Sequence, residues 1–215
     1  TPTATNTAGD LRIGSGSEIV TAVKTRREII VLTNTSIHSM QFIGPPFTFG
    51  INQLASSITV RAFNSAVAVG DAVYWMGYDR FYIYDGRVQV IPCSVRDHVF
   101  QDFNETQSGK VYAGVNSAFG EVFWFYPSAT NSAANGGTDE NDKYVVYNYD
   151  QKIWYVGSLV RTSWIDRGVY QYPMATDSNL VYNHEKGNDN DGTAFTSFIE
   201  SSPIDIQDGD QFVFL

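Results

Sequence analysis

The chain has almost no cysteine, and Cys93 is the only one among its 215 residues. A single thiol excludes an internal disulfide, so packing and hydrogen bonds must hold the fold together, which is compatible with a reducing compartment. Isolated thiols are commonly buried as small apolar groups, and we expect the same of Cys93. No histidine and asparagine lie near it in a pattern that would indicate a catalytic thiol.

Long apolar runs are missing as well. No stretch of about 18 consecutive apolar residues occurs, which excludes a transmembrane helix and predicts no membrane insertion. No secretory signal peptide is visible at Thr1. The chain also lacks an initiator methionine and stops within the apolar run 211–215, so we expect it to be a fragment of a longer protein.

Basic residues are scarce. Lysine and arginine total 14 against 23 acidic residues, which gives a net charge of -9. The densest basic cluster, residues 24–27, lies in a predicted hairpin turn. Binding of nucleic acid without sequence preference needs clustered cations that neutralise phosphates, so the charge pattern argues against it.

Aromatic residues are abundant, at 14% of the chain, while charged residues make up only 17%. This mixture favours β-sheets packed face to face. The clearest pattern fills residues 66–92, where short apolar runs are separated by the turn pairs Gly70-Asp71 and Asp85-Gly86. Such pairs are typical of two-residue hairpin turns. The predicted result is a four-stranded antiparallel meander, with strands at Ala66–Val69, 73–76, Phe81–Tyr84 and Val88–Ile91.

Similar runs recur on both sides of this meander. The first unit has predicted strands at 18–23, 28–33 and 37–42, with 58–63 as its outer strand. The third unit has them at 111–116, 121–126, 144–149 and 152–156. A weaker fourth unit has them at 163–165, 174–176, 180–183 and 194–200, and a further hairpin joins 204–206 to 211–215.

One short helix is predicted between the second and third units, over residues 94–104. Val95, Val99 and Phe103 follow each other at intervals of four residues, which places them on one helical face. Ser94 is a suitable N-cap, because its hydroxyl can accept a hydrogen bond from the first turn.

The third run of each unit, at Ile37, Tyr82, Val145 and Val181, recurs after 45, 63 and 36 residues, and the predicted helix and the loop 127–142 lengthen the second interval. Units of about 40–50 residues with four short strands each are typical of propeller blades. The predicted fold is therefore all-β, a β-propeller or partial propeller of four-stranded antiparallel blades in residues 18–215, after a flexible lead-in over residues 1–17. The alternative is a β-sandwich with Greek-key crossings.

In such a propeller, the aromatic side chains have a structural role. We expect Tyr74, Trp75, Tyr82 and Tyr84 to pack between neighbouring blades, since side chains alternate between the two faces of a strand. A platform on which sugars or bases stack is the less favoured interpretation of these residues.

Two loops are candidate interfaces with other proteins. The Gly-Pro-Pro sequence after residue 43 ends a strand, because proline has no N–H to donate, and it is followed by exposed aromatic residues. Residues 127–142 are rich in Ser, Ala, Asn and Gly and predict a long exposed loop. The candidate interface residues are Pro45, Pro46, Phe47, Phe49, Asn135, Gly136, Gly137 and Asp139.

No metal or cofactor site is predicted. The three histidines, His38, His98 and His184, lie in no metal-binding spacing, and we expect them at the surface or at interfaces. Residues 189–192 resemble half of a calcium loop, but Gly187 and Phe198 stand where the pattern needs acidic residues. Residues 139–142 are similarly rich in oxygen ligands.

No catalytic residue is predicted either. The chain has no G-x-S-x-G motif, and residues 14–17 lack the lysine of a phosphate-binding loop. Two carboxylates could converge in space for glycoside hydrolysis. The available acids are Asp85, Asp97, Asp102, Asp166 and Glu200, for which turn and capping roles are the favoured interpretation.

Several stretches of the chain resemble one protein family. They are IHSMQFIGPPF (37–47), VYWMG (73–77), FYIYDGRV (81–88), VRD (95–97), DKYVVYNY (142–149) and FIESS (198–202). In their residues and in their order along the chain, these stretches resemble tail proteins of short-tailed phages (podoviruses), the stabilisation or tail-nozzle group with propeller-like domains. The resemblance spans residues 28–215, and members of that group are usually much longer chains.

The resemblance implies a non-enzymatic structural protein of the virion tail, made in the host cytoplasm. Such proteins are expected to form a homohexameric ring below the portal and adaptor and to contact tail fibres or spikes. They are also expected to retain and conduct packaged DNA without binding it specifically. The net charge of -9 agrees with a conduit that does not hold phosphates. The alternatives are a propeller glycan hydrolase and a carbohydrate-binding module that act on host surface sugars.

Overall fold

A computed structural model of the chain describes residues 10–15, 18–177, 179–190, 192–194, 204–205 and 212–213. The chain divides into two units, Thr1–His184 and Glu185–Leu215. Among the residues described, none of the helices has the length and apolar character needed to cross a membrane.

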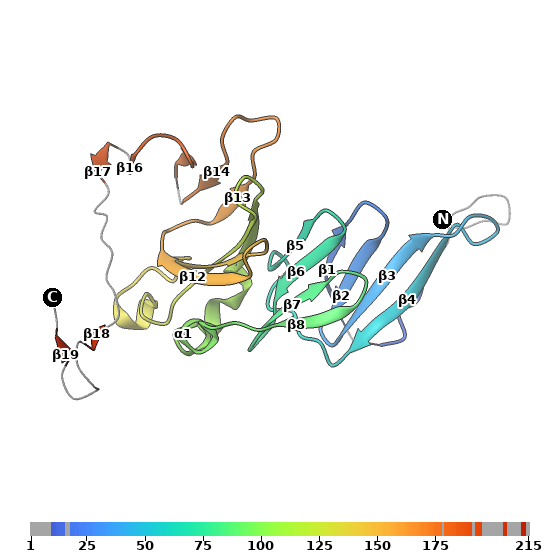
Figure 1. The fold of residues 1–215 in the computed structure, drawn as a ribbon. Coiled ribbons are helices and arrows are strands. Elements are labelled where there is room, and N and C mark those ends of the chain that lie inside the picture. Colours follow the sequence, from blue (N-terminus) through green and yellow to red (C-terminus); the bar gives the residue numbers. More distant parts are fainter. Residues whose placement is uncertain are drawn as a thin grey trace. The chain divides into compact units, whose positions relative to one another are not determined.

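The larger unit contains three four-stranded antiparallel sheets, each built from strands in chain order (Figure 1). The first sheet holds β1 (Ile19–Lys24), β2 (Ile29–Thr33), β3 (Ser36–Phe42) and β4 (Phe49–Ser56). The second holds β5 (Ala66–Val69), β6 (Ala72–Met76), β7 (Phe81–Tyr84) and β8 (Val88–Ile91). The third holds β9 (Tyr112–Asn116), β10 (Glu121–Tyr126), β11 (Lys143–Asn148) and β12 (Ile153–Ser158).

A fourth sheet follows, with three strands. It consists of β13 (Ser163–Ile165), β14 (Met174–Thr176) and β15 (Val181–Asn183), again in chain order. The first strands of successive sheets lie next to each other: β1 contacts β5, β5 contacts β9, and β9 contacts β13. Sequential meanders that meet along their first strands are the blades of a partial propeller, and the all-β prediction is confirmed. The four sheets are called blades 1 to 4 below.

Side chains that point alternately to the two faces of a strand fill the spaces between the blades. In β6, Val73 and Trp75 belong to a buried cluster shared with blade 1, whereas Tyr74 and Met76 belong to a cluster shared with blade 3. Successive side chains of a strand point to opposite faces, so one central blade supplies both clusters. Trp75 stacks on Tyr82 with ring centroids 5.2 Å apart. The predicted packing of these aromatic residues between blades is confirmed.

Trp124 lies at the centre of the cluster between blades 2 and 3. Its side chain is fully buried, with ring centroids 4.9 Å from Phe81 and 6.0 Å from Trp154. Its indole N–H donates to the carbonyl of Ser65, at 3.0 Å, so burial leaves no polar atom of the ring unpaired. Burying such a ring contributes about 2–3 kcal/mol to stability.

Blade 4 attaches to blade 3 through Trp164. This ring stacks on Phe123 at 5.1 Å, and its N–H donates to the carbonyl of Val115 at 2.8 Å. The close approach requires glycine at position 114, because a Cβ there would lie 2.6 Å from the Trp164 ring. The glycine inside β9 therefore permits the contact between the two blades.

The connections between blades each carry a cation that reaches into the following blade. Buried Arg61 donates to the carbonyl of Gly77 in the β6–β7 turn, at 3.3 Å. Lys110 donates into the loop between β10 and β11, and Arg161 donates to the ring of His184 at the end of β15. These charge-assisted hydrogen bonds, together with apolar contacts, hold each connection against the blade that follows it.

The outer strand of blade 1 was predicted wrongly. Residues 58–63 form no strand, and the outer position is taken by β4, Phe49–Ser56. The apolar alternation of 58–63 serves the connection instead: Val60 is buried in the cluster with blade 2, and the N–H of Arg61 donates to Met76 at 2.9 Å. In β4, Gly50 interrupts the pattern, which weakens the strand signal.

The predicted helix is shorter than expected. It comprises α1 (Arg96–Gln101), and a 3-10 helix η1 (Glu105–Lys110) follows it. Val99 and Phe103 are buried, which confirms the apolar face. Ser94 is not the N-cap; Val95 holds that position without a side-chain capping bond, so the prediction of the cap is wrong.

The described residues of the smaller unit form two short hairpins. One pairs β16 (Asp189–Asn190) with β17 (Thr193–Ala194), and the other pairs β18 (Ile204–Asp205) with β19 (Phe212–Val213). The second hairpin confirms the predicted pairing of 204–206 with 211–215 over those residues. Ala194 pairs with β16 rather than with blade 4, so the predicted outer strand 194–200 is wrong at its start, and residues 195–200 lie outside the described part of the chain.

Candidate assembly site

The hairpin between β3 and β4 projects beyond the rest of blade 1. Met40 is the last residue of β3 that faces β2, and beyond it Gln41 and Phe42 pair with β4 alone. A hydrogen bond from the N–H of Ile43 to the carbonyl of Thr48, at 2.9 Å, closes the turn. We call residues 42–49 the β3–β4 tip.

The β3–β4 tip exposes large apolar side chains. Phe42 is 69% exposed, Ile43 57%, Phe47 74% and Phe49 45%. The rings of Phe42 and Phe49 meet edge to face at 5.9 Å, and the two prolines, Pro45 and Pro46, lie in the turn between them. Contiguous exposed apolar side chains at a protruding tip are typical of a surface that binds another molecule.

Charge is absent from this part of the chain. No Asp, Glu, Lys or Arg occurs between residues 29 and 60, although the whole chain carries 37 such residues, 14 basic and 23 acidic. Burying an uncharged surface avoids the cost of removing ions from water. The β3–β4 tip can therefore be covered by a partner at low cost.

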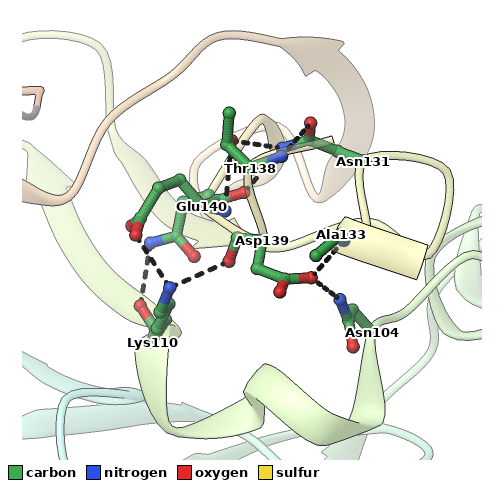
Figure 2. A network of polar contacts seen from close by, with 8 residues as sticks. Asn104, Lys110, Asn131, Ala133, Thr138, Asp139 and Glu140 are labelled. Atoms are coloured by element: carbon green, nitrogen blue, oxygen red, sulfur yellow. Dashed lines mark hydrogen bonds and ion pairs between the residues drawn. The ribbon is translucent and has the colours of Figure 1, made fainter. Parts of the chain in front are cut away.

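The second candidate surface, residues 127–142 between β10 and β11, is held by polar contacts (Figure 2). We call it the β10–β11 loop; it contains the short 3-10 helix η2 (Ala133–Asn135). One carboxylate oxygen of Asp139 accepts from the side-chain amide of Asn104, at 3.0 Å, and from the N–H of Ala133, at 2.8 Å. Asn131 bonds to Thr138 in both directions, at 3.2 Å each.

Of the four interface residues predicted in this loop, Asn135 and Gly136 are exposed, whereas Gly137 and Asp139 are partly buried. Asn141, near its end, is buried and donates to the carbonyl of Lys110 at 2.8 Å. The description of residues 127–142 as a simple exposed loop is therefore corrected, since its stem is fixed and its tip alone is open. Binding by these residues stays a prediction.

A lysine occupies the place that a cation would take in this loop. The ammonium of Lys110 donates to the carbonyl of Asp139 at 3.1 Å and to the carboxylate of Glu140 at 2.7 Å (Figure 2). A bound calcium ion would compete with it for the same oxygens. Within the part of the chain that the structure describes, no group of three or more His, Cys, Asp and Glu residues could hold a metal ion.

The described acids that were considered for glycoside hydrolysis have hydrogen-bond or ion-pair partners. Asp85 accepts from Gln89 at 3.1 Å, Asp97 pairs with Arg96 at 2.9 Å, and Asp166 accepts from the N–H of Ser117 at 3.3 Å. Turn and surface roles of this kind agree with the favoured interpretation. Glu200 lies outside the described residues.

Asp102 joins the end of α1 to the β10–β11 loop and to β11. It accepts from the hydroxyl of Thr130 at 2.9 Å and forms an ion pair with Lys143. Burial alone would raise the pKa of Asp102, but the hydrogen bonds from Lys143 and Thr130 outweigh it and hold the pKa below its usual range. Asp102 is therefore a charged structural link.

His38 does not lie at the surface as predicted, because it is buried within blade 1. Its ring nitrogen Nε2 lies 2.9 Å from the hydroxyl of Ser36 and 3.3 Å from that of Ser15, which comes from the lead-in. Burial lowers the pKa of His38, so the ring is neutral at pH 7. The sequence signal for this cluster is the Ser-x-His spacing in β3, which puts Ser36 and His38 on one face.

The other two histidines and the cysteine lie in ordinary positions. His98 is exposed, as predicted. His184 is partly buried beside Arg161, and burial followed by that charge lowers its pKa to about 4. Cys93 is partly buried against the cluster between blades 2 and 3, and burial raises the pKa of its thiol to about 11, so it is an unreactive thiol at pH 7.

A groove of about 510 Å³ runs along the first strands of blades 2, 3 and 4. No lysine or arginine lines it, and Asp166 is its one charged residue. The lining comes from Asn64, Ala66, Val67, Ala68, Val69, Gly70, Tyr112, Ala113, Gly114, Val115, Ser117, Trp164, Ile165 and Asp166. Such a surface offers nothing to neutralise a phosphate.

Comparison with known proteins gives a likeness in fold. No family model and no curated protein matches the chain. Among solved structures, it is similar to the extracellular domain of a protein described as a one-component system from B. thetaiotaomicron, with 11% identity and a TM-score of 0.51 over 90% of this chain and 24% of that one. A plant lectin with two metal-binding sites from Cicer arietinum matches at 10% identity over 80% of this chain and 92% of the lectin, with a TM-score of 0.35.

Proposed function

We propose that this chain is a non-enzymatic structural subunit of a short-tailed phage tail, in which its propeller blades form part of the tube or nozzle below the portal. The observation that carries the proposal is the β3–β4 tip, a protruding apolar surface in a charge-free stretch of an acidic chain. Proteins seldom present such tips to water unless another molecule covers them. The resemblance of several stretches to tail-nozzle proteins supplies the biological setting.

The proposed ring of identical subunits needs such a surface. A closed ring needs a heterologous contact, in which one patch of a subunit meets a different patch of the next. The β3–β4 tip is one such patch, with Pro45, Pro46 and Phe47 in its turn and Phe49 at the start of β4. The proposed assembly is a homohexamer.

The charge of the chain supports a conduit for DNA. A tube through which DNA leaves the particle must not retain phosphates, and a chain of net charge -9 repels them. The open end of the β10–β11 loop, at Asn135 and Gly136, is the proposed contact with portal, adaptor, fibre or spike proteins. Its fixed stem holds that contact in a defined position, which lowers the entropy cost of binding.

Native mass spectrometry and negative-stain microscopy of the full-length protein test this proposal. We expect closed rings, and we expect antibody labelling of virions to mark the tail at the portal vertex. Glycan-binding and glycan-hydrolysis assays on the same protein test the two alternative functions. A monomer that binds or cleaves host sugars, and that is missing from the tail, would overturn the proposal in favour of a carbohydrate-binding module or a glycan hydrolase.

A further inference from the structure

We call the groove of about 510 Å³ along the first strands of blades 2, 3 and 4 the inner groove. Its volume falls within the range of ordinary ligand sites, which is roughly 300–1,000 Å³. All of β5 lines it, together with most of β9 and the last two residues of β13. The side chains of β5 are Ala, Val, Ala and Val, so no bulky group keeps another chain away from its backbone.

The hydrogen-bonding pattern of blade 2 leaves one edge of β5 open. The N–H of Met76 donates to the carbonyl of Ser65 at 3.1 Å, which makes this a bonded pair directly beyond the β5–β6 ladder. Bonded and non-bonded pairs alternate along antiparallel strands, so Ala66 and Ala68 turn their N–H and C=O groups away from β6. Among the described residues, none forms a hydrogen bond with these outward groups.

The open edge of β5 points into the inner groove, because both faces of the strand are covered. The side chains of Ala66 and Ala68 pack against the cluster shared with blade 1. Those of Val67 and Val69 pack against the cluster shared with blade 3. The outward backbone groups lie between these two faces, on the side of β5 opposite to β6, and the groove is lined by this whole strand.

The corresponding edge of β9 is already in use. The N–H of Ala113 donates to the carbonyl of Asn64 at 2.7 Å, and the carbonyl of Val115 accepts from the indole N–H of Trp164 at 2.8 Å. The described part of the chain therefore supplies partners to the edge of β9 and none to that of β5. Unpaired backbone groups along a strand edge are a template for the addition of a further strand.

Asp166 gives the inner groove its charge, as the one charged residue that lines it. Its carboxylate accepts from the N–H groups of Ser117 at 3.3 Å and Arg167 at 2.8 Å, and it forms no ion pair with another described residue. An ionised carboxylate has about four acceptor positions, so it can bind a cation as well. The net charge of -9 adds a general attraction for a basic partner.

We propose that the inner groove binds an extended basic segment of a partner protein, which adds to β5 as a strand and sets a lysine or arginine beside Asp166. Main-chain hydrogen bonds to Ala66 and Ala68 supply the affinity, and the carboxylate selects the cationic side chain. The four residues of β5 span about 13 Å, which matches a bound segment of about four residues. This inference goes beyond the proposed tail function and does not depend on it.

Three blocked peptides test the binding. The first alternates threonine and valine around a central lysine, the second has glutamate in place of the lysine, and the third keeps the lysine but carries N-methyl groups on its backbone nitrogens. N-methylation removes the donors that an added strand needs and leaves the side chains unchanged. With the full-length protein, fluorescence anisotropy should show the glutamate peptide binding about fivefold and the N-methylated peptide about tenfold more weakly than the first.

Three substitutions locate the site. Ala68→Pro removes an outward N–H without removing a bond of the β5–β6 ladder, and we expect it to weaken binding of the lysine peptide about tenfold. Asp166→Asn should weaken that binding about threefold and abolish the preference over the glutamate peptide. The matched control is Asp85→Asn, which changes an exposed acid in the β7–β8 turn and should leave the binding of both peptides unchanged.

Hydrogen exchange decides whether the peptide lies along β5. The lysine peptide should protect the amides of Ala66 and Ala68 and leave those of β8 unchanged. A wild-type protein that does not bind the lysine peptide at about 1 mM, or that binds it equally well after N-methylation, overturns the inference. Protection of the two alanine amides by a soluble oligosaccharide and not by the peptide overturns it as well, in favour of a sugar site.

The proposed tail function and the peptide site fail in different ways. Closed rings that bind none of the peptides would overturn the peptide site alone. A monomer that is missing from the tail but binds the lysine peptide along β5 would overturn the tail function alone. If Ala68→Pro does not fold, the N-methylated peptide gives the same decision on the wild-type protein.

Discussion

The β3–β4 tip and the β10–β11 loop both leave the body of a blade, but they are held in different ways. The tip is closed by a turn hydrogen bond and an aromatic contact, and its apolar side chains are exposed. The loop is longer and almost free of large apolar residues, yet its side chains bond to each other and to the connection that contains η1. Length and polarity therefore do not decide how firmly a loop is held.

The difference assigns separate roles to the two regions. Polar contacts fix the stem of the β10–β11 loop within the chain and use the polar groups of that stem, so that only its open end, at Asn135 and Gly136, is left to a partner. The apolar groups of the tip gain nothing from water and are available to a partner. Changes in the loop should therefore alter the stability of the single chain, whereas changes in the tip should alter association.

Gly137→Ala should have the largest effect on stability. A Cβ at this position would lie 2.1 Å from the backbone carbonyl oxygen of Asn131, so the loop must shift to accept it. We expect the free energy of unfolding to fall by about 2–3 kcal/mol. The control is Gly136→Ala, where the space is open and the left-handed backbone alone costs about 1 kcal/mol. Equal losses in urea titrations of the two variants would contradict the fixed loop.

Asp139→Ala should have the next largest effect. It removes the acceptor for the amide of buried Asn104 and for the N–H of Ala133, and it puts alanine at a left-handed φ of +59°, so we expect a loss of about 2 kcal/mol. Asp139→Asn retains one acceptor oxygen and should lose less. Hydrogen exchange locates the effect, since the amides of residues 131–140 should lose protection while those of β3 and β4 keep theirs. A uniform loss across both regions would argue against a local role.

The blade pattern was predictable because its signals are local. Pairs such as Gly70-Asp71 and alternating apolar runs mark the strands of blades 2 and 3, and those strands are where they were expected. The same pattern gave a wrong outer strand for blade 1. Apolar residues alternate more regularly in 58–63 than in β4, where Gly50 and Gln53 interrupt the alternation. Local sequence cannot distinguish a strand from a connection whose apolar residues face the same core.

The contacts that fix the candidate surfaces were not predictable, because they join distant residues. Lys110 meets Glu140 across a separation of 30 residues, and Ser15 meets His38 across 23. Composition described the β10–β11 loop correctly as polar, but exposure depends on partners that composition does not reveal. The exposed aromatic residues of the tip were predicted, since the prolines before Phe47 end the hydrogen-bonding pattern of a strand.

Lowering the pH should loosen the β10–β11 loop but not the β3–β4 tip, and this effect should be smaller than those of the two substitutions above. Asp102 has a lowered pKa, so its contribution to stability is complete above the ordinary carboxyl value of 3.8 and is lost as the pH falls through the lower value of the folded state. We expect the β10–β11 loop to lose exchange protection below pH 3.8, and Asp102→Asn to reduce that dependence. The tip has no titratable group, so its protection should not follow the same curve. Coincident curves for both regions would contradict separate control.

Phe47→Ser should have the smallest effect on the stability of the single chain and should still matter for association. The ring is 74% exposed, so its removal gives up little buried area, and we expect thermal unfolding of the monomer to change by no more than about 0.5 kcal/mol. In a ring the same side chain would be covered, and its loss should shift the assembly midpoint to higher concentration. Phe119→Ser, which changes a residue 53% exposed in the β9–β10 turn, is the matched control. A tip variant that assembles like this control would show that the exposed aromatic residues of blade 1 do not bind a second copy.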